Sequence, residues 1–588
     1  MAQFASRLTP ARLTTQASAL LSRRFLLTLA LVYILAGLFF RDPWKTDDVV
    51  GLAAMMTTAL EGGHTWLLPQ LGQLAHAQNG PLPTWIGALS ILLFSPLFEL
   101  FLPQPDAAIV AARLPNLLWF GLIAYAVWYG SYLLGRRSEA QPLALPFGGE
   151  PSPRDYGRMI ADAALLLTLA TAGIMWRLHE TSEVPVLIAF QALVFLAIAR
   201  MPSRPFAGGL LLSVALAGVF LSRGLIGGLP ILGAVLCCLL PGLPLWLVRR
   251  WAVPSLLLAV CLVALWWWPA SQIGPYWMRN WWHWNLDSFR WPGQDDFGGS
   301  ILRDLPWFLW PTWPFALMAL WRWRMWLHAP HIWLPLMLLL WPLAMLWFLA
   351  DPFEPEYSLL ALPSAVLAAF ALPTLRRGFV NSLDWFAVMC FSLACATVWL
   401  GWLALQTGWP EQISRNIARQ TEGFEPGISW AALALAALGT LAWILLVRWR
   451  LLRKPVALWR GTVVYAGGIV LTWLLLATLW MPALDYARSY RTVSHQMAQA
   501  IERHSRPGEC VRAYDVGLGQ RASFLVFDRL DFSFSRGCAL VLQQTSQQNI
   551  EEGLTAFSND NARVLWVGKR GADRRGQEVF RLLRLRQP

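Results

Sequence analysis

Residues 41–90 of this 588-residue chain read RDPWKTDDVVGLAAMMTTALEGGHTWLLPQLGQLAHAQNGPLPTWIGALS. This stretch mixes charged, turn-forming and apolar residues, and it directly follows a strongly apolar run near residues 24–40. Ionisable groups beside a membrane span are energetically costly, so they point to function when they occur. We expect residues 41–111 to form a long external loop after a first membrane-spanning helix.

The composition of the whole chain indicates a polytopic α-helical membrane protein. Hydrophobic residues make up 56% of the sequence and charged residues 14%, and the mean hydropathy is +0.46. Soluble globular chains carry about 25% charged residues. The net charge of +13 does not indicate nucleic-acid binding, because the basic residues mostly lie in short clusters between apolar runs, as the positive-inside rule predicts.

Fourteen apolar runs follow one another, and most approach the roughly 20 residues that a helix needs to cross hydrocarbon. They lie near residues 24–40, 82–102, 112–135, 158–176, 184–199, 207–222, 225–247, 252–270, 306–321, 331–350, 357–374, 380–407, 429–447 and 461–480.

The basic residues between these runs set the expected orientation. Arg23 and Arg24 precede the first run and place the N-terminus in the cytoplasm. The run at 82–102 is interrupted by Pro83 and Pro96, so we interpret it as a membrane-surface or re-entrant helix. About thirteen spans remain. The sequence then predicts a multi-pass protein of a bacterial inner membrane with its C-terminal part in the periplasm.

The tail of the chain differs in composition from the rest. We expect a transmembrane domain at 1–484 and a small soluble α/β domain at 485–588, with a helix at 490–504. The short apolar runs of the tail are interpreted as strands, at 511–514, 523–527, 539–542 and 564–567. Cys510 and Cys538 are the cysteines of this tail, and an extracytoplasmic location permits a disulfide; the sequence does not supply their separation.

Two carboxylate pairs lie at the outer ends of predicted spans. Asp47 and Asp48 belong to the first external loop, and Glu180 and Glu183 precede the apolar run at 184–199. If the topology is correct, both pairs face the same outer side. The alternative is that they cap helix N-termini, where carboxylates are favourable.

Several short motifs occur in a fixed order along the chain. Asp47–Asp48 is followed by GGHTWLLPQLGQ, QNGPLPTW and AARLPN, then by SEVPVLIAF, GVFLSRGLIGG and YSLLALPSAV. This order resembles the GT-C glycosyltransferases that use polyprenyl-phosphate sugars, a group that includes protein O-mannosyltransferases and the bacterial lipid A aminoarabinose transferase. The tail segments RTVSHQMAQAI and ARVLWVGKRG resemble the end of the aminoarabinose transferases, so the resemblance extends over nearly the whole chain.

The resemblance implies a membrane glycosyltransferase that moves a sugar from a polyprenyl-phosphate donor to a periplasmic acceptor, either a lipid A-like glycolipid or a protein. Because a lipid phosphate is a good leaving group, such an enzyme needs a cation to hold the phosphate and a carboxylate to orient or deprotonate the acceptor. The implied catalytic residues are Asp47 and Glu183. The implied substrate-binding residues are Asp48, Asn79, Arg223, His283, Arg290 and Tyr357.

Several of these residues carry a second interpretation. Arg223 is a phosphate clamp or an arginine that extends from a helix end to the membrane surface. His283 is a metal ligand or a member of the aromatic belt at the interface. The family pattern has Glu–Lys before Pro-Pro-Leu, whereas this chain has Gln78–Asn79–Gly80. The contacts of that Glu–Lys pair with metal and lipid phosphate are therefore in doubt, and a divalent metal ion is left open as a cofactor.

Two other functions compete with a glycosyltransferase. A non-catalytic membrane scaffold of the same fold is favoured by the replaced Glu–Lys pair. A transporter is disfavoured because the predicted spans are mostly uncharged and the acidic groups lie at one face. A nucleotide-sugar donor is not indicated, since no nucleotide-binding fingerprint occurs in the sequence.

Overall fold

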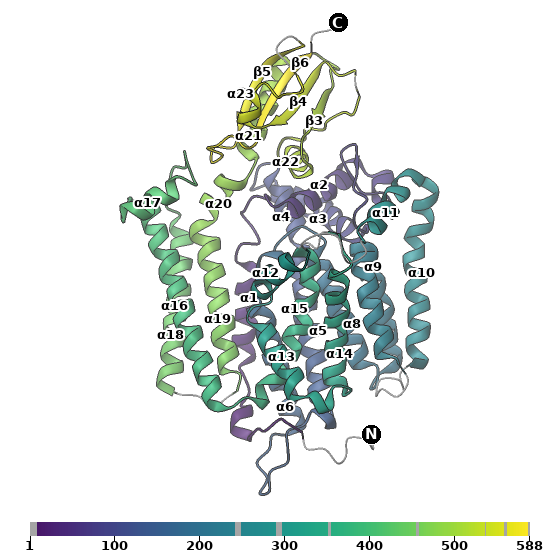
Figure 1. Cartoon of the computed structure of the whole chain (residues 1–588), viewed down its shortest axis with the longest axis vertical. Helices are drawn as coiled ribbons and strands as arrows, with labels where there is room; N and C mark the ends of the chain where they lie inside the picture. The colour runs from purple at the N-terminus through teal and green to yellow at the C-terminus, as the bar shows by residue number, and fades with distance from the viewer. Residues whose placement is uncertain are drawn as a thin grey trace.

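The computed structural model describes residues 9–240, 249–289, 297–350, 354–453, 458–535, 537–557 and 561–585. It shows a tall bundle of helices with a small sheet at one end (Figure 1). The bundle contains α1 (Arg23–Leu35), α5 (Pro115–Gly135), α6 (Pro153–Ala170), α7 (Ala172–Arg177), α8 (Val184–Arg200), α9 (Pro205–Cys238), α10 (Arg249–Ile273), α13 (Thr312–Arg322), α14 (Pro330–Leu346), α15 (Glu354–Ala371), α16 (Arg377–Thr407), α18 (Trp430–Arg453) and α19 (Arg460–Leu475).

Seven helical segments within the described residues are long and apolar enough to cross a membrane, judged by length and composition. They are Asp106–Gly135, Pro205–Cys238, Arg249–Ile273, Glu354–Thr374, Gly378–Thr407, Trp430–Leu452 and Arg460–His504. Three shorter apolar helices are α3 (Leu82–Phe98), α8 and α14. The prediction of a many-helix membrane fold is therefore confirmed, and the number of thirteen crossings stays a prediction.

The 34-residue α9 joins the two predicted runs at 207–222 and 225–247, but it reverses its direction between them. Arg223 and Gly224 leave helical backbone angles, and Gly224 has a φ of +59°. A Cβ built on Gly228 would lie 2.3 Å from the ring of Phe220. In a straight helix these two residues would be separated by about 12 Å along the helix axis, so the two halves of α9 must fold back on each other. Asn285 of α11 (Pro275–Asp287) accepts the Leu225 N–H at 2.8 Å and fastens this turn.

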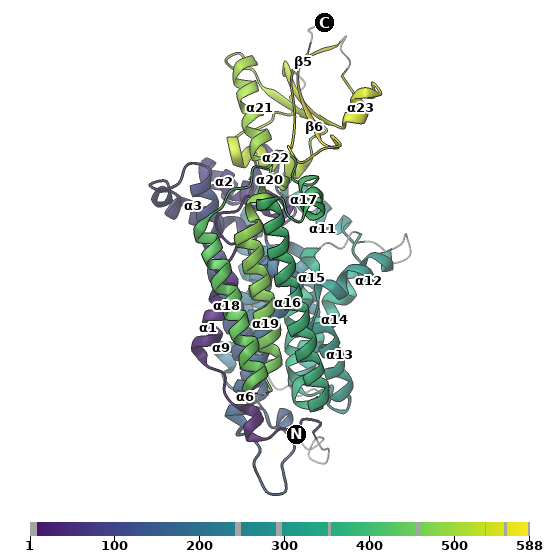
Figure 2. The same cartoon turned by 90° about the vertical axis from the view of Figure 1, so that its left-hand side faces the viewer.

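The first external loop forms a layer across the end of the bundle that faces the sheet (Figures 1 and 2). The layer consists of α2 (Thr46–Glu61), α3 and α4 (Asp106–Arg113), with the short strands β1 (Gln70–Leu71) and β2 (Leu74–Ala75) between α2 and α3. Because α2 and α4 both pack on α3, the run at 82–102 lies in this layer, outside the bundle of long helices. That position outside the bundle agrees with a membrane-surface helix.

The tail forms a four-stranded sheet in the order β3-β4-β6-β5, in which β3 and β4 are parallel and the other pairs are antiparallel. Its elements are α21 (Arg491–His504), β3 (Val511–Tyr514), α22 (Leu518–Asp528), β4 (Leu540–Thr545), α23 (Gln547–Glu551), β5 (Ala562–Lys569) and β6 (Val579–Leu585). The predicted helix at 490–504 and the strands at 511–514, 539–542 and 564–567 are confirmed.

The predicted strand at 523–527 is wrong, because these residues belong to α22. Phe524 packs in the core of the sheet domain, whereas Ala522, Val526 and Phe527 pack against α2. A helix buried on two sides needs apolar residues around most of its circumference, so its sequence loses the helical period and reads as an apolar strand.

A disulfide joins Cys510 to Cys538, with the two Cα atoms 5.1 Å apart. The two cysteines are 28 residues apart in the sequence, so the disulfide closes a long loop in the unfolded chain. We expect the double variant C510S/C538S to lower the free energy of unfolding by about 3–4 kcal/mol, because the unfolded chain regains the conformational entropy that the disulfide removes. Thermal denaturation in detergent would show a lower melting temperature for this variant than for Cys390→Ser, which removes an exposed free thiol. Equal melting temperatures would contradict the expectation.

Candidate functional site

Two ion-pair clusters lie where the external layer meets the end of the bundle. The first is centred on Arg177 at the end of α7. Its guanidinium contacts Asp47 at 2.9 Å, Glu180 at 2.9 Å and the carboxylate of Glu354. Lys45 joins the same group, with its ammonium 3.1 Å from Glu354. We call these five residues the Arg177 cluster.

The accessible side of the Arg177 cluster is formed by three of its members. The side chain of Asp47 is 40% exposed, that of Glu354 is 52% exposed and that of Lys45 is 28% exposed. Arg177 and Glu180 lie beneath them and are buried. A substrate that approaches this end of the bundle therefore meets two carboxylates and one ammonium group first.

The second cluster is centred on Arg223, which the reversal of α9 presents toward the external layer. All three guanidinium nitrogens are engaged: they donate to Asn79 at 2.6 Å and to Glu356 at 2.7 and 3.1 Å, and they pair with Glu183 at 2.8 Å. Asn79 also donates to Glu183 at 3.2 Å. These four residues, the Arg223 cluster, are all buried, and the ring of Trp284 covers the guanidinium at 5.2 Å.

The same two segments build both clusters. The first turn of α15 supplies Glu354 to the Arg177 cluster and Glu356 to the Arg223 cluster. The loop between α7 and α8 supplies Glu180 to the first and Glu183 to the second. The clusters therefore form one continuous site, and the charge of Asp47 acts on both Glu183 and Arg223.

A close approach of the external loop brings Asn79 into the site. The Gly80 N–H donates to the Ser222 carbonyl at 3.2 Å, and a Cβ on Gly80 would lie 2.0 Å from the carbonyl oxygen of Leu221. Only glycine fits there. Asn79 thus places an amide between Glu183 and Arg223.

Asp48 points away from the accessible side. Its fully buried carboxylate pairs with Arg41 at 3.1 Å and Arg113 at 3.4 Å, and it accepts hydrogen bonds of 2.7 Å from the Thr181 N–H and hydroxyl. Burial opposes the charged form of Asp48, but both arginines and both hydrogen bonds outweigh it and lower its pKa. In this structure Asp48 fastens α2 to the loop between α7 and α8.

The remaining predicted residues are Tyr357, His283 and Arg290. Tyr357 is buried next to Glu356, with its ring 5.7 Å from that of Phe308 in α12 (Phe297–Phe308). His283 is exposed on α11 and lies 4.0 Å from Asp287. Arg290 lies outside the residues that the structure describes.

Sequence reasoning missed Lys45, Arg177, Glu354 and Glu356 as members of the site, and it noted Glu180 without assigning it a role. The signal for Glu354 and Glu356 is the segment EPEY directly before an apolar run, because two acidic residues at a predicted span are costly unless they are paired. The signal for Arg177 is weaker, since a single arginine at a span end is commonly a membrane-surface residue.

The described residues do not fit a resident metal ion. No group of three or more His, Cys, Asp or Glu side chains among them could hold one. Each carboxylate of the two clusters instead contacts a guanidinium or ammonium group.

Comparison with known proteins was made at the level of sequence and of structure. The sequence matches no protein-family model and no curated protein. The fold, in contrast, is that of a polytopic membrane protein that has been solved in two states, and the similarity extends over nearly the whole chain.

That protein is ArnT from Cupriavidus metallidurans, a lipid A aminoarabinose transferase. Its crystal structure bound to undecaprenyl phosphate has a TM-score of 0.62 to this chain at 15% sequence identity, and its apo structure has a TM-score of 0.60. Each comparison covers 95% of this chain and 97% of ArnT. The resemblance to the aminoarabinose transferases that the motifs suggest is thus confirmed for the fold.

Glu180 gives the site a pH-dependent component of stability. Burial raises its pKa to about 7, with Arg177 and Lys45 opposing the rise and Asp48 and Asp47 adding to it. The folded protein therefore holds this proton more tightly than the unfolded chain, and stability falls as pH rises from the unfolded pKa toward 7. We expect the melting temperature of Glu180→Gln, relative to the unmodified protein, to increase between pH 5 and pH 8. A difference that stays constant with pH would contradict this.

Removal of Arg223 should destabilise the protein strongly. The variant Arg223→Met leaves Glu183 and Glu356 buried without their counter-charge, which costs about 3–5 kcal/mol. The variant Arg303→Met removes an exposed arginine paired with Asp304 and should change the stability little, because solvent screens an exposed ion pair. Thermal denaturation of both in detergent tests the difference. Similar melting temperatures would show that the Arg223 cluster is not a buried ion-pair network.

Proposed function

We propose that this chain is a multi-pass membrane glycosyltransferase that moves a sugar from a polyprenyl-phosphate donor to an acceptor at the outer membrane face. The observation that carries the proposal is the continuous site of the Arg177 and Arg223 clusters, which opens through Asp47, Glu354 and Lys45. The fold similarity to ArnT, which was crystallised with undecaprenyl phosphate, supports the choice of donor class.

Asp47 is the proposed catalytic carboxylate. It is held by Arg177 and remains 40% exposed, so an incoming acceptor can reach its oxygens while its position stays fixed. In the proposed reaction it orients or deprotonates the acceptor nucleophile, which then attacks the anomeric carbon of the sugar. The bond between that carbon and the phosphate oxygen breaks, and the lipid phosphate leaves with the electron pair.

The leaving phosphate requires a cation. Arg223, the residue that the sequence suggests, has its three guanidinium nitrogens engaged, so it could bind phosphate only by releasing Glu356, Glu183 or Asn79. Lys45 is the more accessible cation of the site, and we add it to the proposal as a phosphate-binding residue. Glu183, Asn79 and Asp48 then act as positioning residues. His283, Arg290 and Tyr357 remain proposed substrate contacts.

The proposed setting is a bacterial inner membrane with the site on the periplasmic side. The sheet and the α6 end of the bundle lie at opposite ends of the molecule (Figure 1), as expected if the C-terminal domain, residues 485–588, is outside and the N-terminus is cytoplasmic. Thr15, near the N-terminus, donates to the Gly149 carbonyl in the loop before α6. The proposed acceptor is a glycolipid of the lipid A type or a protein. A non-catalytic scaffold of the same fold is the alternative that the following experiment addresses.

We expect purified protein in lipid nanodiscs to transfer radiolabel from an undecaprenyl-phosphate sugar to a membrane acceptor, and Asp47→Asn to reduce the rate about a hundredfold or more. Asp515→Asn, an exposed residue of the sheet domain with a positive φ that asparagine tolerates, is the matched control. If transfer survives in Asp47→Asn, then Asp47 is not the catalytic carboxylate, and an acceptor that is already ionised, such as a phosphate, is favoured. No transfer from any of a panel of donors, with the protein folded, would favour the scaffold.

A further inference from the structure

A third group of charged side chains lies at the end of the bundle opposite the sheet, where α16 and α19 begin and α18 ends (Figures 1 and 2). Asp384 of α16 is buried there. Its Oδ2 atom accepts hydrogen bonds from Arg450 of α18 at 2.6 and 2.9 Å and pairs with Arg460 of α19 at 3.2 Å. We call these three residues the Asp384 cluster, which joins three helices.

The Asp384 cluster has an excess of positive charge. Two guanidinium groups share one carboxylate, and their side chains are only 10% and 13% exposed. Asn381 also accepts from both arginines, but it is neutral and leaves the charge unbalanced. The Nη1 atom of Arg450 donates to no residue that the structure describes. Because a buried charge without a counter-charge is strongly unfavourable, an anion bound at this position would be stabilised.

A cavity of about 520 Å³ lies beside the cluster, and its volume is in the range of about 300–1,000 Å³ that is typical of small-molecule sites. Arg450 and Arg460 line it together with Arg12, and Asp384 is the one carboxylate among its lining residues. The charges around the cavity therefore favour a ligand with a net negative charge.

One wall of this cavity comes from the N-terminal segment, residues 12–17, and hydrogen bonds to distant parts of the chain hold it in place. The Arg12 N–H donates to the Pro373 carbonyl at 3.0 Å, and the Leu458 N–H donates to the Ala17 carbonyl at 2.9 Å. The side chain of Arg12 is exposed, so it can turn toward a ligand. The cavity is thus a defined space with one adaptable cation at its entrance.

The outer rim of the cavity is apolar. Trp385 is 55% exposed and Leu451 is 39% exposed, and these lining residues belong to α16 and α18, two of the candidate spans. A tryptophan near the end of a span is typical of the boundary between membrane and water. A ligand in this cavity contacts both buried positive charge and the lipid-facing surface of two spans. A phospholipid meets both requirements, whereas a soluble anion meets only the first.

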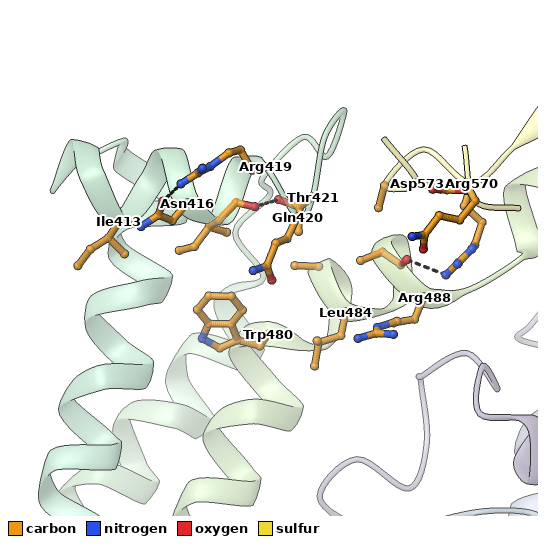
Figure 3. Close-up of a pocket in the computed structure, with 15 residues that line it drawn as sticks. Ile413, Asn416, Arg419, Gln420, Thr421, Trp480, Leu484, Arg488, Arg570 and Asp573 are labelled. Atoms are coloured by element: carbon orange, nitrogen blue, oxygen red, sulfur yellow. Dashed lines mark hydrogen bonds between the residues drawn. The ribbon is translucent and has the colours of Figure 1, made fainter. Parts of the chain in front are cut away.

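The other large cavity of the described residues, of about 770 Å³, differs in these respects (Figure 3). It lies at the sheet end, between α17 (Glu411–Ala418), α20 (Met481–Arg488) and the turn between β5 and β6. Two of its arginines, Arg419 and Arg488, are exposed, and Arg419 donates to Asn416. Solvent screens such exposed charges, so Arg419 is a suitable control for the buried Arg450.

We propose that the cavity beside the Asp384 cluster binds an anionic glycerophospholipid of the membrane leaflet at this end of the molecule. The phosphate accepts hydrogen bonds from Arg450 and Arg12 and supplies the negative charge that Asp384 alone does not. The acyl chains lie against Trp385 and Leu451, along α16 and α18. A basic pocket between the ends of spans is suited to this class of head group. The site is separate from the Arg177 and Arg223 clusters and does not depend on the proposed transfer reaction.

The test compares two lipids with the same acyl chains. Full-length protein in detergent is titrated with phosphatidylglycerol and, in a second series, with phosphatidylethanolamine, and native mass spectrometry measures the first bound lipid. We expect phosphatidylglycerol to bind about tenfold more tightly, because phosphatidylethanolamine has no net charge. Arg450→Gln should remove most of this preference. Asp384→Asn should increase it, because the competing carboxylate is lost. Changes in opposite directions are not expected if both variants merely disturb the packing.

The control variant Arg419→Gln should keep the preference of the unmodified protein. If Arg450→Gln does not fold, Arg460→Gln replaces it, since it removes the other positive charge of the cluster. Equal binding of the two lipids would overturn the site, and so would equal effects of Arg450→Gln and Arg419→Gln or a weaker preference in Asp384→Asn. Displacement of phosphatidylglycerol by an equal concentration of glycerol 3-phosphate would overturn the assignment to a membrane lipid and indicate a soluble phosphate instead.

Discussion

The ion pairs of Asp48 are the interaction on which the rest of the site depends. A fully buried carboxylate is tolerated only when its charge is matched and its lone pairs are used, and here Arg41, Arg113 and Thr181 meet both requirements. These partners come from the segment between α1 and α2, from α4 and from the loop before α8. The carboxylate of Asp48 thus joins three parts of the chain. We call this contact of Asp48 with Arg41, Arg113 and Thr181 the joint, and Asp47 lies next to it at the surface.

This joint gives the segment between α1 and α5 a defined geometry. A Cβ on Gly51 would lie 2.1 Å from the Thr181 carbonyl oxygen, so α2 contacts the 178–183 loop without intervening side chains. The loop is then shared between the Arg177 and Arg223 clusters, and a shift of α2 would move both. Residues fixed by such packing and by neighbouring hydrogen bonds hold the reacting groups more accurately than a free loop does.

Much of the architecture could be predicted from sequence because a membrane imposes a strong pattern. Apolar runs near 20 residues predicted the many-helix fold, and the polar pattern of the tail predicted the helix at 490–504. The site was predicted only in part. Asn79, Glu183 and Arg223 were selected as separate candidates, and the structure brings them together. Glu356 was missed because it opens an apolar run, and the pairing of Arg177 with three carboxylates depends on contacts that no local sequence pattern reports. The apolar face of α22 was misread as a strand because its burial comes from α2, far away in the sequence.

The packing of α22 on α2 has a consequence for the order in which the protein can be made. Ala522, Val526 and Phe527 share one hydrophobic core with Val49, Leu52 and Ala53 of α2. Roughly 470 residues of synthesis separate these partners, which at about 5–20 residues per second corresponds to ~25–90 s. During that interval the face of α2 that packs on α22 lacks this partner. The packing of the sheet domain on α2 therefore forms only after α22 has been translated.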